Sequence, residues 1–216
     1  MKKRKTHILA FIIFSLLLDP YSGFSQNEGD PVIDKKVRAF LEKNNNKWRD
    51  MNVPRSDGQL LYNLIIENNY TKALEIGTST GHSGVWIAWA LSKTGGKLIT
   101  IDIDESRHKE ALSNFKEAGV SEYIDARLAD AHKLVPELKG PFDFVFSDAD
   151  KNWYKNYFID VIDKLDKGGC FTAHNVLNTW QGSGIKEFLD YVESLPYMKT
   201  TIDKGSSSGV SISFKQ

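Results

Sequence analysis

Short apolar runs alternate along the chain with longer stretches in which apolar positions recur at helical spacing. The runs predict strands over residues 73–77, 97–104, 123–128, 142–147 and 170–174. The stretches around them predict helices over residues 32–44, 59–68, 85–91, 105–118, 131–138, 151–165 and 184–195. Strands that alternate with helices in this way are typical of an α/β fold built on a parallel sheet.

The last part of the chain departs from this alternation. Two strand-like runs, 199–203 and 210–214, flank a Gly-Ser-Ser-Ser-Gly segment that is typical of a hairpin loop. A hairpin adds an antiparallel strand at the edge of a parallel sheet. We therefore predict a Rossmann-like, doubly wound, mostly parallel seven-stranded sheet with a C-terminal antiparallel hairpin. The amphipathic helix at 32–44 is expected to lie over one end of that sheet.

The stretch Ala73–Ser83, with the sequence ALEIGTSTGHS, predicts a ligand site. It begins as a strand, continues as a loop with glycines at 77 and 81, and leads into a helix. Glycine lacks the Cβ that would keep a ligand away from the backbone, and a helix N-terminus favours an anionic group. The following strand, KLITIDID, ends in acids, of which Asp102 is suited to accept the hydroxyls of a ribose. These features predict a nucleoside-cofactor site at the carboxyl edge of the sheet.

The spacing of this loop distinguishes between cofactors. A dinucleotide fingerprint needs G-x-G-x-x-G, and Ser79 stands where its second glycine would be. The chain instead has E-x-G-x-x-x-G, which runs from Glu75 through Gly77 to Gly81. This spacing resembles motif I of the class I S-adenosylmethionine (SAM) methyltransferases.

Length, charge and cysteine content limit the possible number of domains, partners and disulfides. The 216 residues suffice for one α/β domain with a substantial core. The 28 basic and 28 acidic side chains cancel, so no overall field attracts nucleic acid, and nucleic acid is not expected as a partner. The single cysteine, Cys170, has no second thiol with which to form an intramolecular disulfide and is expected in the core.

Residues 1–25 have the pattern of a signal peptide. Basic residues at positions 2–5 precede the apolar run Ile8–Leu18, and the small residues Gly23 and Ser25 precede Gln26. The apolar run is short for a membrane span. We expect export to the periplasm or the medium with cleavage after Ser25, and a retained membrane anchor is the alternative. Residues 26–50 are then expected to form a linker and an N-terminal helix, and residues 51–216 the SAM-dependent methyltransferase domain.

Polar side chains also follow two later strands. Asp148, Asp150 and Lys151 come directly after FDFVFS, and His174 and Asn175 come after CFTA. Because the carboxyl ends of parallel strands meet at one edge of a sheet, Asp148, His174 and Asn175 are expected to converge on one divalent cation. The alternative for Asp148 and Asp150 is that they cap the helix that follows, which would explain one of them more easily than both.

Longer segments carry a specific resemblance. FDFVFSDADKNWYKNYF and KGGCFTAHNVL, together with LEIGTSTGHS and TIDID, resemble the cation-dependent O-methyltransferases, the family of caffeoyl-CoA and catechol O-methyltransferases. Met51-Asn52-Val53 and Gly58-Gln59 are similar to the segment that precedes motif I in that family. The resemblance covers Met51 to Leu177. It implies SAM, a divalent cation and a small hydroxylated aromatic acceptor.

The resemblance also implies a role for each matching position. The implied catalytic residues are Lys151, as the base, and Asp148. The implied cation ligands are Asp148 and Asn175, with His174 as a third candidate. Trp153, Tyr154 and Trp180 are candidate walls of the acceptor pocket, with ordinary packing as the alternative for each. The implied SAM site consists of Val53, Glu75, Gly77, Ser79, Gly81, Ser83, Asp102, Ile103, Asp130, Ala131, His132 and Asp148.

Methyl transfer explains why residues of these types would be needed. The reaction is an in-line displacement at a sulfonium carbon, so it depends on holding a nucleophilic oxygen against the methyl group. A divalent cation chelated by two vicinal oxygens lowers the pKa of the acceptor hydroxyl and fixes its orientation. A lysine close by can then take the proton. Such a site selects catechol-like acceptors.

One position departs from the family pattern, because His174 stands where the family has an acid. A neutral imidazole carries one negative charge fewer than a carboxylate. It should weaken binding of Mg²⁺ and shift the preference toward a softer ion such as Mn²⁺, Zn²⁺ or Fe²⁺. The alternative is that His174 is not a ligand and that the site has no metal role.

Three functions follow from these observations. An O-methyltransferase for a small phenolic or catechol-like acceptor is favoured, because Lys151, Asp148, Asn175 and the SAM loop are all intact. The alternative is an exported, non-enzymatic protein that binds SAM or another small ligand, since export would separate an enzyme from cytoplasmic SAM. Methylation of a nucleoside in RNA is disfavoured by the balanced charge and the leader. The N-terminal helix and the hairpin are candidate surfaces for a homodimer.

Overall fold

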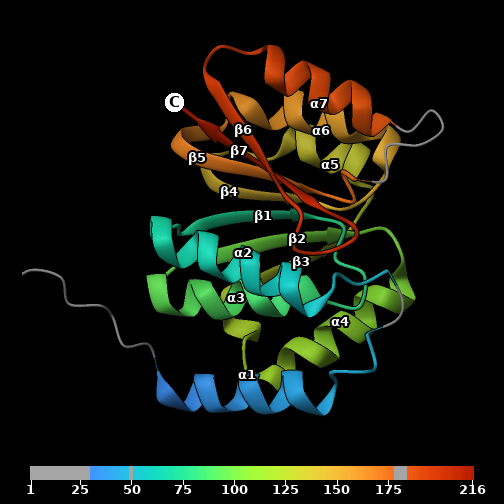
Figure 1. Cartoon of the computed structure of the whole chain (residues 1–216). Coiled ribbons are helices and arrows are strands. Elements are labelled where there is room, and N and C mark those ends of the chain that lie inside the picture. Colours follow the sequence, from blue (N-terminus) through green and yellow to red (C-terminus); the bar gives the residue numbers. More distant parts are fainter. Residues whose placement is uncertain (1–29, 49–50, 178–183) are drawn as a thin grey trace, which may run out of the picture.

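The computed structural model describes residues 30–48, 51–177 and 184–216. Within these residues, seven strands form one sheet in the order β3-β2-β1-β4-β5-β7-β6 (Figure 1). Strands β1 to β5 pair in parallel, and β7 runs antiparallel to both β5 and β6. This arrangement confirms the predicted sheet and its terminal hairpin. The strands are β1 (Lys72–Ile76), β2 (Lys97–Asp102), β3 (Ile124–Leu128), β4 (Phe142–Ser147), β5 (Leu165–His174), β6 (Met198–Asp203) and β7 (Val210–Lys215).

Helices cover both faces of the sheet, so the central strands are largely buried on both sides and contain short apolar runs. In Figure 1, α5 (Ala131–Glu137), α6 (Tyr154–Ile162) and α7 (Gly184–Ser194) lie on one face. The other face carries α2 (Arg55–Asn68), α3 (His82–Thr94) and α4 (Glu105–Ala118). Rings pack tightly under α6 and α7, where Phe158 and Phe188 contact Phe171 with ring centroids 5.1 and 5.7 Å apart. Each buried phenylalanine side chain contributes about 1.5–3 kcal/mol to folding.

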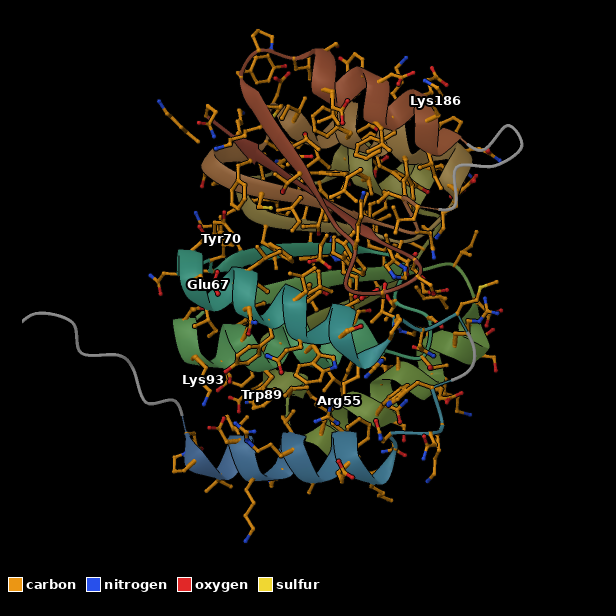
Figure 2. The ribbon with its side chains drawn as sticks, in the orientation of Figure 1. Arg55, Glu67, Tyr70, Trp89, Lys93 and Lys186 are labelled. Carbon is orange, nitrogen blue, oxygen red and sulfur yellow. The ribbon has the colours of Figure 1, made fainter. Side chains whose placement is uncertain are left out.

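The N-terminal helix, α1 (Pro31–Lys43), has a different position from the one predicted. It does not cover an end of the sheet but forms a further layer on α3 and α4 (Figure 1). Trp89 and Lys93 lie on the side of α3 that faces α1 (Figure 2). The Trp89 indole donates a hydrogen bond of 2.7 Å to Asp34 of α1, and Lys93 forms an ion pair with the same carboxylate.

Several predicted element boundaries differ from the structure, and two of the differences have clear physical reasons. β5 begins at Leu165, five residues before the predicted start, because Leu165 pairs with Phe142. The pairing register shifts between Phe142 and Phe144, and this irregularity accommodates the two glycines at 168 and 169 that resembled a helix end. The predicted helix 151–165 is consequently shorter and consists of a 3₁₀ turn, η2 (Lys151–Trp153), followed by α6.

The second boundary lies at the start of α2, which begins at Arg55 (labelled in Figure 2) rather than at Gln59. The earlier start places Asp57 in the first turn of the helix, where it is 1% exposed. No helix in the described ranges is long and apolar enough to cross a membrane. The predicted signal peptide, residues 1–25, lies outside the described residues.

Candidate functional site

A cavity of about 690 Å³ lies where β1, β2, β4 and β5 end, as expected for an open α/β sheet. Its volume falls in the range of small-molecule sites. The cavity is lined by eleven of the predicted site residues, namely Gly77, Ser79, Asp102, Ile103, Asp130, Ala131, His132, Asp148, Lys151, His174 and Asn175. Four other predicted residues, Val53, Glu75, Gly81 and Ser83, are buried and do not line it.

The loop between β1 and α3 reaches the cavity in a conformation that depends on glycine. Gly77 has a φ of 103°, and a Cβ at this position would lie 2.8 Å from the carbonyl carbon and oxygen of Asp148. Ser79 follows with a φ of 46°, and its N–H donates to Oδ2 of Asp102 at 2.7 Å. The loop therefore passes directly against the end of β4, where a residue larger than glycine would not fit.

Glu75 supports this loop from inside the fold and does not line the cavity. It is fully buried, and its Oε2 accepts a hydrogen bond of 2.5 Å from the hydroxyl of Thr100. Desolvation raises the pKa of Glu75 to about 8, although hydrogen bonds from Ser83 and Thr100 oppose this shift. Ser83 thus contacts Glu75 inside the fold, although the resemblance implied that it belongs to the SAM site.

The side of the cavity near β2 and α5 carries groups suited to a nucleoside. Asp102 is held by two backbone donors, Ser79 N–H on Oδ2 and Asp104 N–H on Oδ1 at 2.8 Å, and retains lone pairs toward the cavity. Ile103 is 71% exposed although it is apolar, so it offers an uncovered surface for a flat ring. Asp130 caps α5 by accepting from the His132 N–H at 3.0 Å and also contacts the His132 ring nitrogen Nδ1 at 2.9 Å.

The opposite wall carries a row of charged side chains. His174 Nε2 lies 2.8 Å from Oδ2 of Asp57, and its Nδ1 lies 3.2 Å from Oδ2 of Asp148. Lys151 Nζ donates to the other oxygen of Asp148 at 2.6 Å and to the carbonyl of Ala149 at 3.2 Å. Although desolvation opposes the charged form, the two carboxylates raise the pKa of His174 to about 9 in the free protein. A bound cation would therefore compete with a proton for this ring.

Asp148 and Asp150 have separate roles, as the capping alternative anticipated. Asp150 caps η2 by accepting from the Asn152 N–H at 2.9 Å, while Asp148 faces the cavity. The described part of the chain contains no group of three or more His, Cys, Asp or Glu side chains able to hold a metal ion. The predicted set supplies two such side chains, Asp148 and His174, together with the amide of Asn175. These three side chains line the same cavity, and a cation there would compete for Asp148 with the proton on Nδ1 of His174 and with the Lys151 amine.

The predicted acceptor walls lie elsewhere. Tyr154 is fully buried and donates from its hydroxyl to the carbonyl of His174 at 3.1 Å, so it belongs to the core. Trp153 packs edge-on against His132, with ring centroids 4.7 Å apart, and does not line the cavity. Tyr157 lines it instead, one helical turn beyond the predicted pair. Trp180 lies outside the described residues.

Two buried residues next to the cavity were not predicted as part of the site. Asp57 was interpreted only as part of a helix start, and nothing in its local sequence indicates its contact with His174. His82 follows Gly81 directly, and its Nδ1 lies 2.8 Å from the carbonyl of Val53 while the Trp86 indole donates to its Nε2 at 3.1 Å. Burial lowers the pKa of His82 to about 4, so a neutral ring holds the segment around Val53 over the loop.

Comparisons with known proteins agree with this arrangement. A family model described as O-methyltransferase matches residues 24–199. Caffeoyl-CoA O-methyltransferase 1 of Eucalyptus globulus is 33% identical over 159 residues, which cover 71% of this chain and 63% of the relative. Caffeoyl-CoA O-methyltransferase of Zinnia elegans is 34% identical over 160 residues, with 71% and 63% covered. The matched part thus spans 63% of the length of these curated relatives.

Solved structures show the same fold. An O-methyltransferase from Bacillus cereus in complex with SAH has a TM-score of 0.71 at 23% identity, over 87% of this chain and 91% of the other. That identity supports the fold alone. An O-methyltransferase from Streptomyces achromogenes in complex with SAM has a TM-score of 0.72 at 25% identity, over 87% of this chain and 90% of the other.

The buried carboxyl of Glu75 predicts a pH dependence of stability. Its pKa in the fold, about 8, lies above its unfolded value of 4.5, so the folded state holds the extra proton. The corresponding stability is present below pH 4.5 and is lost as the pH rises toward 8. Relative to Glu75→Gln, the free energy of unfolding of the natural chain should fall by about 2–4 kcal/mol across this window, as measured by urea unfolding without ligands. The control Glu67→Gln, on the exposed side of α2 (Figure 2), should leave the pH profile unchanged. A natural chain and Glu75→Gln variant with parallel profiles would contradict the prediction.

Proposed function

The chain belongs to the O-methyltransferase family, and on this premise we propose that it transfers the methyl group of SAM to a hydroxyl of a small phenolic acceptor. One observation carries the proposal: the glycine loop with Asp102 and the Asp148–Lys151 pair line one cavity. The glycine loop and Asp102 suit a nucleoside cofactor. The Asp148–Lys151 pair suits an acceptor hydroxyl that must lose its proton. The names of the relatives support the same reaction class.

The residues around the loop fit SAM. We assign the ribose hydroxyls to Asp102, one face of the adenine to Ile103, and its edge to Ala131, His132 and Asp130. Gly77 and Ser79 line the cavity, which supports an approach of the ligand to the backbone of this loop. SAM supplies an electrophilic methyl group on a sulfonium, and its transfer to a hydroxyl oxygen leaves a neutral thioether and releases the hydroxyl proton.

We assign the released proton to Lys151. Asp148 and the carbonyl of Ala149 hold the Lys151 amine at the cavity wall, within reach of an acceptor hydroxyl. The amine must first lose a proton to solvent, and the side chain is 32% exposed, so solvent has access to it. It then takes the proton of the hydroxyl as the oxygen attacks. Asp148 holds the amine in place and balances the positive charge that forms on it.

We also propose that a divalent cation assists the reaction, held by Asp148, His174 and Asn175. The position of all three side chains in the wall of one cavity supports this site. Such a cation would lower the pKa of a chelated hydroxyl and orient it. Vicinal hydroxyls, as in catechol, are therefore the favoured acceptor pattern. A homodimer through α1 or the β6–β7 hairpin stays a prediction.

Export is a separate proposal, supported by the signal-peptide pattern of residues 1–25. Protein recovered from the periplasm or the medium should begin at Gln26 when its N-terminus is sequenced. Recovery only from the cytoplasm, with the leader intact, would contradict export. Recovery from the membrane with the leader intact would favour the retained anchor.

Calorimetric titration of SAM into the full chain tests the cofactor assignment. The natural chain should bind SAM, and Asp102→Ala should weaken binding by about 10- to 100-fold, because hydrogen bonds to a charged group contribute about 1.5–3 kcal/mol. The control Asp125→Ala removes an exposed acid from β3, outside the cavity, and should leave the affinity unchanged. Absence of SAM binding by the natural chain would overturn the proposed function.

Substitution of the base tests the chemistry. Lys151→Met should lower kcat for methylation of catechol by about 10²- to 10⁴-fold, the usual contribution of a general base, without changing the affinity for SAM. Lys155→Met is the matched control, since its side chain is equally exposed (32%) and pairs with Glu187 outside the cavity. Equal losses in the two variants would argue against a role for Lys151 as the base.

A further inference from the structure

The residues that line the cavity follow the order of the strands in the sheet. Asp102 ends β2, Gly77 follows β1, and Lys151 lies shortly after β4. The strand order places β5 and then β7 beyond β4, on the side away from β2. The assigned cofactor residues therefore lie at one end of this row and the assigned base lies near its middle. An acceptor held at Lys151 has the ends of β5 and β7 on its far side.

The loop of the C-terminal hairpin, residues 204–209, borders that far side. Because β7 is antiparallel to β5, the start of β7 lies at the carboxyl end of β5, where His174 pairs with Val210. In Figure 1 this loop lies at the end of the sheet toward which β1 and β2 point. Ser208, two residues before Val210, lines the cavity. The hairpin loop thus contributes one side chain to the cavity wall on the side away from the cofactor residues.

Three features fix the position of this loop. The Ser206 hydroxyl donates a hydrogen bond of 2.8 Å to the buried carboxylate of Asp57. The N–H of Leu177, which follows β5, donates to the carbonyl of Ser208 at 3.0 Å. Gly209 has a φ of 70°, and a Cβ at this position would overlap the side chain of Leu177. The fold therefore holds the backbone of Ser208 on both sides.

The hydroxyl of Ser208 is available to a ligand. Within residues 30–48, 51–177 and 184–216 it has no hydrogen-bond partner, and the residue is half-buried. A serine hydroxyl can donate and accept, and it carries no charge. Since β5 separates β4 from β7 and neighbouring strands lie about 4.8 Å apart, the ends of β4 and β7 are about 10 Å apart. One phenolic ring with a small substituent, hydrogen-bonded at both ends, spans such a distance.

We propose that Ser208 is a specificity-determining residue, which binds a neutral polar substituent of the acceptor ring on the side away from the methylated hydroxyl. The inference rests on the proposed function and names the acceptor class within it, namely catechols with a short uncharged group such as hydroxymethyl. Lys151 and His174, two cations of this wall, already pair with carboxylates, which favours a neutral substituent over an anionic one.

Methylation of two catechols of similar shape tests this inference in the full chain. One carries a hydroxymethyl group para to a hydroxyl, and the other carries an ethyl group at the same position. Ser208→Ala should lower the ratio of kcat/KM for the first catechol to kcat/KM for the second by about 2- to 10-fold, the usual contribution of one hydrogen bond. The loss should appear in KM with kcat unchanged, because the contact is equal in the ground state and the transition state.

Two further variants separate recognition of the substituent from disturbance of the loop. Ser208→Thr retains the hydroxyl and should keep the ratio of the natural chain. Ser207→Ala removes the neighbouring hydroxyl, which is exposed and does not line the cavity, and should leave the ratio unchanged. A ratio as low in Ser208→Thr as in Ser208→Ala, or an equal fall in Ser207→Ala, would overturn the role of the Ser208 hydroxyl.

The outcomes distinguish this inference from the proposed function. Methyl transfer to both catechols, with the same ratio in the natural chain and in Ser208→Ala, would overturn the inference and leave the proposed function standing. Absence of transfer to either catechol by the natural chain would overturn the proposed function and this inference with it.

Discussion

A buried carboxylate is stable only where hydrogen-bond donors replace the water that it loses, and this requirement governs one half of the molecule. Asp57, on the first turn of α2, is satisfied by the ring of His174 at the end of β5 and by Ser206 in the hairpin loop. Despite desolvation, these hydrogen bonds lower the pKa of Asp57 below its ordinary value. His174 in turn contacts Asp148 after β4. A helix, two strand ends and a hairpin are thereby held in one arrangement around the cavity.

Local sequence patterns predicted the helices and strands correctly wherever no tertiary pairing changed their bounds. The bounds of α4 and β4 agree with the prediction, because Gly119 closes one and an unbroken apolar run defines the other. The start of β5 was missed because its pairing with β4, which no local pattern records, carries the strand past Gly168 and Gly169. The outer position of α1 was missed for a similar reason. The apolar face of α1 can pack on other helices as well as on a sheet, so its sequence does not distinguish the two positions.

The polar residues at strand ends were predictable because parallel strands bring their carboxyl ends to one edge. The direction of each side chain was not. Glu75 and Ser83 belong to the predicted loop motif, yet they face each other inside the fold. Asp57 and His174 are 117 positions apart, so their contact has no local signal at all. Alternation of apolar and polar residues thus identifies the edge of the sheet that carries the site, while the partners of each group depend on the tertiary fold.

The contact between Gly77 and the backbone of Asp148 joins the two halves of the cavity. The Asp148 N–H donates to the carbonyl of Ile76 at 2.8 Å, and Gly77, which follows β1, has no room for even a methyl group. The cofactor loop and the charged wall of the cavity are therefore joined by direct backbone packing. For protein engineering, this means that the acceptor half cannot be exchanged as a module at the boundary between β1 and β4. A successful chimera would have to carry both strand ends together.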